Sequence, residues 1–336
     1  MIFHLNELQK QYTKILADYI EEQTERNLYI GQNFIRQLLQ KNIAPEEVIH
    51  IHKSAVEEII DDFPISLRHA YDFLIEVMVH YGLALSEHKS LLQQQEEMQL
   101  ELQVATNIQN MILKSHVPKI DGVDVGMISV PARKMSGDYV HFIDDKNRYI
   151  GIAVADVVGK GIPAALCMSM VKYGMDSLDY SESEPERVLE VINRIVEKSV
   201  DDSMFVSMFY GRYDVETSTF AYGSAGHEPA LHYKAASQTY EELVAKGLLL
   251  GILPDGNYEQ HEVQLQQNDL VIMMTDGVTE IRTNLEMDAM AIITSIISEH
   301  KHERAQQIVD EVFKQLEKMQ NFELSDDFTL VILKKN

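Results

Sequence analysis

The sequence contains few of the residues that cross-link a chain or interrupt its regular structure. Only one of its 336 residues is cysteine, which excludes an intrachain disulfide and a cysteine-rich zinc site. Glycine (16 residues) and proline (8 residues) are scarce, which argues against long disordered or collagen-like regions. Because 45% of the residues are hydrophobic, the chain can bury a core, and its length predicts two domains.

Positive charge is also scarce. The chain has 29 Lys and Arg residues against 53 Asp and Glu residues, a formal net charge of −24 at pH 7. Such a surface repels the phosphate backbone of nucleic acids and the headgroups of anionic lipids. We therefore expect neither a nucleic acid nor a membrane surface as a partner.

Long hydrophobic runs are missing as well. The longest apolar stretch, residues 73–85, has 13 residues and contains Glu76 and His80. It is shorter than the roughly 20 apolar residues that a membrane-spanning helix needs. The first residues do not show the basic and then apolar pattern of a signal peptide. We expect a cytoplasmic protein.

Residues 1–85 have the pattern of a small helical bundle. Apolar residues recur at helical spacing between residues 15 and 39. Pro45, followed by two glutamates, is typical of a helix start, and residues 62–66 are a second break. We predict a small bundle of about four helices.

Residues 86–117 predict a helical linker. Its stretch 86–113 contains no glycine or proline, and these residues recur at alternating spacings of four and three: Leu91, Gln95, Met98, Leu102, Ala105, Gln109 and Ile112. This heptad pattern fits a single connecting helix and a two-stranded coiled coil in a homodimer equally well. Glutamines at the seam weaken a coiled coil, so such a linker would be marginal and switchable.

Residues 118–336 predict an α+β domain. Short apolar runs, several of them alternating with period two, predict strands at residues 123–130, 149–156, 204–213, 219–226, 269–276 and 328–335. Helical stretches lie between them, at about residues 162–177, 185–200, 287–299 and 302–319. Strands that follow one another directly, with helices grouped between sets, favour antiparallel sheets.

Aspartates recur at the tips of these strands, at Asp138, Asp156, Asp276, Asp326 and Asp327. A carboxylate beside a buried strand is costly unless it is compensated, and a hard cation such as Mg²⁺ or Mn²⁺ compensates it. Two such ions about 3.5–4 Å apart lower the pKa of a water and direct it at phosphorus. The alternative is structural, with Asp276 in a turn and Asp326 in a loop.

Other candidate sites are weaker. Residues 159–161, Gly-Lys-Gly, do not form the full motif of a phosphate-binding P-loop. Cys167 lies in an apolar helical stretch, which predicts a core residue rather than a nucleophile. His227 fits either a ligand or base, or a loop histidine that fixes a turn.

Five motifs occur in order: SGD (136–138), ADVVGKGIPAAL (155–166), SAGHEP (224–229), TDGVTE (275–280) and DDFTLV (326–331). Together they resemble the PPM-type, metal-dependent Ser/Thr phosphatases of the SpoIIE-like bacterial branch, over about residues 105–335. With its helical N-terminal region, the chain is similar to members that activate the sigma-B general stress response. The resemblance implies an α-β-β-α sandwich with metals in a cleft at one end.

The resemblance also implies a site built around two divalent ions, Mn²⁺ or Mg²⁺. Asp156 would bridge both ions, and the backbone carbonyl of Val157 would ligate the first. Asp276 and Asp326 would hold the second ion, and Asp138 would bind a metal directly or through water.

Two assignments stay open. Asp327 is a further candidate metal ligand, at a position where many eukaryotic relatives carry Asn, so either of the adjacent acids can be the ligand. Arg133 lies five residues before Asp138, where some family members place a phosphate-binding arginine. A solvated arginine is the other interpretation.

The implied reaction is hydrolysis of a phosphoserine by metal-activated water, without a covalent intermediate. The implied substrate is an RsbV-like anti-anti-sigma factor, and an RsbT-like switch kinase would bind residues 1–85. We hypothesise that kinase binding orders the linker of a homodimer, which presses on the helix after Gly161 and moves Asp156 and Val157 into metal-binding geometry. The alternatives are a catalytically inactive scaffold and a nucleotide phosphohydrolase.

Overall fold

The computed structural model describes residues 2–41, 43–144, 148–159, 161–178, 184–200, 204–280, 288–320, 322 and 324–336. Lys160 of the Gly-Lys-Gly motif lies outside these ranges. The chain divides into two compact units, Met1–Glu101 and Leu102–Asn336. Among the described helices, none has both the length and the apolar character needed to cross a bilayer.

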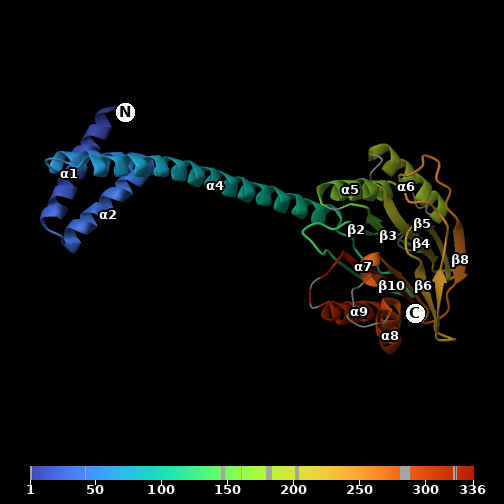
Figure 1. The fold of residues 1–336 in the computed structure, drawn as a ribbon. Coiled ribbons are helices and arrows are strands. Elements are labelled where there is room, and N and C mark those ends of the chain that lie inside the picture. The colour runs from blue at the N-terminus through green and yellow to red at the C-terminus, as the bar shows by residue number, and fades with distance from the viewer. Residues whose placement is uncertain are drawn as a thin grey trace. The chain divides into compact units, whose positions relative to one another are not determined.

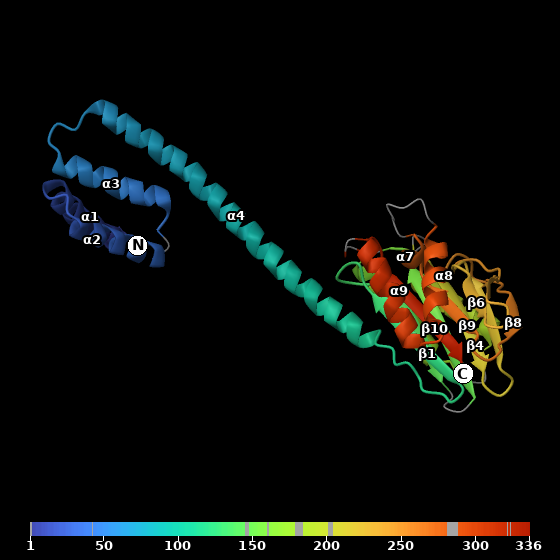
Figure 2. The same ribbon diagram turned by 90° about the horizontal axis from the view of Figure 1, so that it is seen from below.

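The first unit is helical, with α1 (Ile2–Glu21), α2 (Glu25–Gln40), α3 (Pro45–Ile59) and the first part of α4 (Ile65–Ile112) (Figure 2). Thr24 caps α2 by accepting a hydrogen bond from the backbone of Asn27, and Pro45 occupies the first turn of α3. A small core around Leu8, Phe34 and Leu38 joins α1, α2 and α3. The helical N-terminal region is thus as the sequence predicts.

Helix α4 runs without interruption from Ile65 to Ile112 and includes most of the predicted linker. Two of the heptad residues, Leu91 and Met98, are exposed. Gln109, also a heptad residue, is buried within the second unit. The end of α4, from Leu102 on, therefore belongs to the second unit and packs within it.

The second unit contains two antiparallel five-stranded sheets. One has the order β1 (Val123–Val130), β10 (Phe328–Lys335), β9 (Leu270–Met274), β6 (Ala230–Lys234) and β7 (Thr239–Leu243). The other has the order β2 (Asp138–Asp144), β3 (Tyr149–Val157), β4 (Val206–Asp214), β5 (Thr219–Ala225) and β8 (Gln260–Gln264).

The sheets stack face to face between two pairs of helices (Figure 1). Helices α5 (Ile162–Asp176) and α6 (Pro185–Ser199) pack on the sheet of β2, whereas α8 (Ala289–His300) and α9 (Ala305–Met319) pack on the sheet of β1. Strand β3 shows why its sequence is apolar throughout. Ala153 and Ala155 face the helices, and Ile152 and Val154 face the opposite sheet. The α-β-β-α sandwich is confirmed.

Four strands, β2, β6, β7 and β8, lie outside the runs that the sequence identifies. Asp138, which the sequence places at a strand tip, is the first residue of β2. The predicted helix at 287–299 corresponds to α8, which begins at Ala289, and residue 287 lies outside the described ranges.

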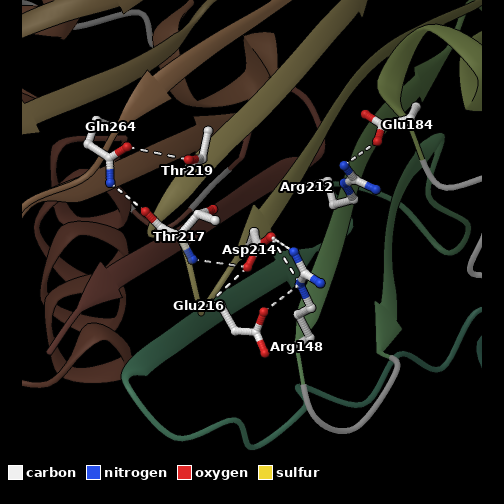
Figure 3. Close-up of polar contacts among 8 residues, drawn as sticks. All are labelled: Arg148, Glu184, Arg212, Asp214, Glu216, Thr217, Thr219 and Gln264. Carbon is white, nitrogen blue, oxygen red and sulfur yellow. Dashed lines mark hydrogen bonds and ion pairs between the residues drawn. The ribbon is translucent and has the colours of Figure 1, made fainter.

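A polar network lies at the end of the second sheet that is opposite Asp156 (Figure 3). Arg148 donates to Asp214 Oδ2 from Nε at 3.1 Å and from Nη2 at 2.8 Å. Arg212 on β4 pairs with Glu184 just before α6. The first contact joins the start of β3 to the end of β4, opposite the end that carries Asp156, and the second joins β4 to the start of α6.

Candidate active site

Strand pairing brings two of the candidate aspartates together. Asp138 at the start of β2 lies opposite Asp156 near the end of β3. Gly137 comes next to this pair, and a Cβ there would lie 3.1 Å from Asp156 Oδ1, 3.4 Å from the Val157 carbonyl oxygen and 3.7 Å from that of Gly159. The absent side chain thus leaves a space bordered by three oxygen atoms.

Asp138 is the most buried of these acids, with 4% of its surface exposed. Its Oδ2 accepts a hydrogen bond from Thr275 Oγ1 at 2.8 Å. Burial is the largest cause that raises its pKa well above the usual value, and the charges of Asp156 and Asp327 raise the pKa further. Negative charge is therefore concentrated around Asp138, where a cation would relieve it.

A second close approach joins the remaining acids. Asp276 opens the short helix α7 (Asp276–Thr279), directly after Thr275. A Cβ at Gly277 would lie 2.0 Å from the carbonyl oxygen of Asp327, so only glycine allows the two segments to touch. This contact places Asp276 beside the start of β10.

The adjacent acids Asp326 and Asp327 have different surroundings. The carboxylate of Asp327 accepts hydrogen bonds from the backbone of Ala132 at 2.8 Å, the backbone of Gly137 at 2.6 Å and Ser136 Oγ at 3.1 Å. It fastens the loop before β2 to the start of β10. One contact of Asp326 is local: its Oδ1 accepts a hydrogen bond from the backbone N–H of Asp327 at 3.0 Å.

A pocket of about 350 Å³ opens between these segments. It is lined by Leu102, Thr106, Ala132, Arg133, Lys134, Met135, Gly137, Gly161, Asp326 and Asp327. Arg133 is exposed and belongs to this lining, so the structure is compatible with a phosphate-binding role for it and with a solvated one.

The donor set fits a hard cation, because every candidate ligand atom is a carboxylate or carbonyl oxygen. Asp156 and the Val157 carbonyl, which the family resemblance assigns to the first ion, both border the space at Gly137. Within the described ranges, no three His, Cys, Asp or Glu side chains form a ready metal cluster. The assignment of Asp138, Asp156, Val157, Asp276, Asp326 and Asp327 as metal ligands stays a prediction.

The surroundings of His227 and Cys167 favour structural roles for both residues. His227 Nδ1 lies 2.8 Å from Ser207 Oγ, and Nε2 lies 3.2 Å from the carbonyl oxygen of Met274. Burial lowers the pKa of His227 to about 4, so the neutral ring donates from Nε2 and accepts at Nδ1. The structure favours the histidine that fixes a turn. Cys167 is buried in α5, and burial raises the pKa of its thiol to about 11.

Glu228 is a site residue that the sequence did not single out. Both of its carboxylate oxygens lie 2.9 Å from Thr279 Oγ1, which donates to them. Burial raises its pKa, and so does the charge of Asp276. His227 and Glu228 therefore hold the chain on either side of Asp276, and their adjacency in SAGHEP is the only signal in the sequence.

The family model for Stage II sporulation protein E (SpoIIE) matches residues 146–336, and that for the N-terminal domain of phosphoserine phosphatase RsbU matches residues 10–84. Phosphoserine phosphatase RsbU of Bacillus subtilis (strain 168) is 45% identical over 328 residues, which cover 98% of each chain. The chain belongs to the RsbU family.

Two solved structures of other proteins share the fold of the second unit. The SiaA-PP2C domain of Pseudomonas aeruginosa superposes with a TM-score of 0.60 at 17% identity, over 72% of this chain and 98% of that one. RsbX in complex with magnesium gives 0.51 at 18% identity, over 66% of this chain and 99% of that one. This RsbU-family chain is therefore a PP2C-type phosphatase.

Proposed function

We propose that the chain is a metal-dependent phosphatase that hydrolyses the phosphoserine of an RsbV-like anti-anti-sigma factor. The observation that carries the proposal is the approach of Asp138 and Asp156 around the oxygen-bordered space at Gly137. Membership of the RsbU family supports a phosphoprotein as the substrate in preference to a nucleotide.

The residues that would hold two Mn²⁺ or Mg²⁺ ions divide between the two close approaches. Asp156 would contact both ions, with the Val157 carbonyl at the first and Asp276 and Asp326 at the second. Asp138 would bind a metal directly or through water. When bound, such ions lower the pKa of a nucleophilic water and neutralise charge on the phosphate oxygens. The magnesium held by RsbX supports a divalent cation in this fold.

The chain's own residues prepare this site. Thr275 donates to Asp138 Oδ2 and so fixes the orientation of the carboxyl group. Asp327 holds the loop that carries Gly137, which favours Asp326 over Asp327 as the metal ligand. Arg133 lines the same pocket as Gly137 and Asp326, which supports a phosphate-binding role for it.

The partner side of the proposal rests on the first unit. Helix α2 exposes large apolar side chains, including Leu28, Tyr29 and Leu39, the last with 67% of its surface exposed. Exposed apolar patches are typical of protein interaction sites. We assign this surface to an RsbT-like switch kinase, within residues 1–85 of a cytoplasmic protein.

A homodimer is the proposed route for regulation. The exposed heptad residues Leu91 and Met98 would pair with those of a second copy in a coiled coil. The end of α4 supports coupling to the site, because Leu102 and Thr106 line the same pocket as Gly161 and Asp326. Kinase binding would then act through α4 on this pocket.

The proposed function is tested by the release of phosphate from a phosphoserine protein in the presence and absence of Mn²⁺. We expect Asp276→Asn to lower the rate by about 100-fold or more, since it removes a charge that the ions require. Asp255→Asn, in an exposed loop, is the matched control and should leave the rate unchanged. Activity without metal, or full activity in Asp276→Asn, would contradict the proposal.

A further inference from the structure

The last turns of α4 bury a polar side chain. Gln109 has 4% of its surface exposed, and its Nε2 donates to the carbonyl oxygen of Ser136 at 2.8 Å. Its Oε1 is buried with no hydrogen-bond partner among the described residues. Burial of an amide with one group unsatisfied is costly, so packing alone does not explain a glutamine here.

Gln109 holds one edge of a single peptide unit. The Ser136 carbonyl and the Gly137 N–H belong to the same planar peptide. Gln109 binds the carbonyl at one edge, and Asp327 Oδ2 accepts from the N–H at the other edge at 2.6 Å. Two contacts on opposite edges of a rigid plane determine how that plane is turned.

The orientation of this peptide sets the geometry of the proposed metal site. Gly137 borders the space shared by Asp156 Oδ1 and the Val157 carbonyl oxygen. The hydroxyl of Ser136 also accepts from the backbone N–H of Asp138 at 3.1 Å. A rotation of the peptide would therefore move Gly137 and Asp138 together.

We propose that Gln109 is a positioning residue for the metal site, through which the end of α4 sets the affinity for the divalent ion. The inference rests on the proposed function and adds a specific contact to it. The neighbouring Thr106 does not share this role, because its hydroxyl donates to the Leu102 carbonyl of its own helix at 2.8 Å.

The test uses the full chain with two substitutions at one position. Gln109→Met keeps the length of the side chain and removes the donor, and Gln109→Glu keeps the shape and replaces the donor with an acceptor. The matched control is Gln103→Met, on the exposed face of the same helix, where the glutamine contacts only Asn107 among the hydrogen bonds found for its side chain.

Three quantities are measured on each variant: the Kd for Mn²⁺ from the paramagnetic resonance of free Mn²⁺, the Tm without metal, and the Mn²⁺ dependence of hydrolysis. We expect both substitutions of Gln109 to weaken Mn²⁺ binding by about 10-fold or more, as for other residues that orient metal ligands. The Mn²⁺ concentration that half-saturates hydrolysis of para-nitrophenyl phosphate should rise in parallel, and Gln103→Met should match the unsubstituted chain.

Unchanged Mn²⁺ affinity in the Gln109 variants would overturn the inference, whether or not the Tm falls. Loss of folding in both variants would also overturn it, because Gln109 would then be a stability residue. The proposed function has its own test. Full activity in Asp276→Asn contradicts the phosphatase site whatever the Gln109 variants show. If Asp276→Asn is inactive, the Mn²⁺ affinity of the Gln109 variants alone decides this inference.

Discussion

At the scale of single residues, two glycines allow the acidic segments to approach each other. At Gly137 the missing side chain leaves room beside Asp156, and at Gly277 it lets the backbone of Asp327 come into contact. Neither glycine requires a positive φ angle, since the glycines with positive φ lie elsewhere in the chain. Their role is therefore closeness rather than conformation.

Substitution of Gly277 should disrupt the site and the fold together. A methyl group there would meet the Asp327 carbonyl oxygen at 2.0 Å, so we expect Gly277→Ala to lower the free energy of unfolding by about 1–3 kcal/mol. Phosphatase activity should be lost as well. Gly31→Ala, in α2 with no atom within 4 Å of the new Cβ, should raise the stability by up to about 1 kcal/mol. Denaturant unfolding checks both values, and an unaffected Gly277→Ala variant would contradict the close approach.

His227 makes stability depend on pH. Its pKa is lowered from 6.5 to about 4 in the folded chain by burial, so only the unfolded chain takes up the proton between these values. The stabilising contribution of the neutral ring is present above pH 6.5 and is lost as the pH falls towards 4. As the pH falls from 6.5 to 4, the Tm of His227→Gln should fall by less than the Tm of the unsubstituted chain. His80→Gln, at an exposed position, serves as the control. The same dependence of Tm on pH in all three proteins would contradict the lowered pKa of His227.

At the scale of elements, the loop before β2 and the start of β10 form one unit through Asp327. The sequence predicts β3 and β10 because both faces of these strands are buried and their runs are apolar. It does not reveal β7 and β8, whose outward faces carry Glu, Gln and His. The pairing of Asp138 with Asp156 depends on the β2–β3 register, which no local pattern specifies.

The two adjacent acids should respond differently to substitution. Asp327→Ala leaves three donors of the loop without their acceptor, so we expect it to lower the free energy of unfolding by about 1–3 kcal/mol. Asp326→Ala should mainly weaken Mn²⁺ binding. Unfolding curves and Mn²⁺ titrations separate the two effects. The reverse pattern would assign the ligand to Asp327.

At the scale of the whole molecule, α4 carries both the exposed heptad residues and the buried contacts of the second unit. The sequence identified this segment as helical and placed Gln109 at a seam position. It did not show that Gln109 is buried against Ser136, because that contact joins residues 27 positions apart. The outcome for Arg133 is similar: its place in the pocket comes from the fold, whereas the sequence gives only its spacing from Asp138.

The linker hypothesis predicts that association of α4 from two copies activates the enzyme. A chain that starts at residue 86 should have low basal activity, and fusion of a strong parallel coiled coil at residue 86 should raise it. A monomeric helix of equal length is the control. Low activity in the fused protein, with its dimeric mass verified in solution, would refute this mechanism.

The central claim is that aspartates distant in the sequence bind a pair of divalent ions in the second unit. Anomalous diffraction from crystals grown with Mn²⁺ tests it most directly. We expect two manganese peaks, one beside Asp156 and the Val157 carbonyl and the other beside Asp276 and Asp326. Crystals that contain manganese elsewhere but show no peak at these oxygens would contradict it.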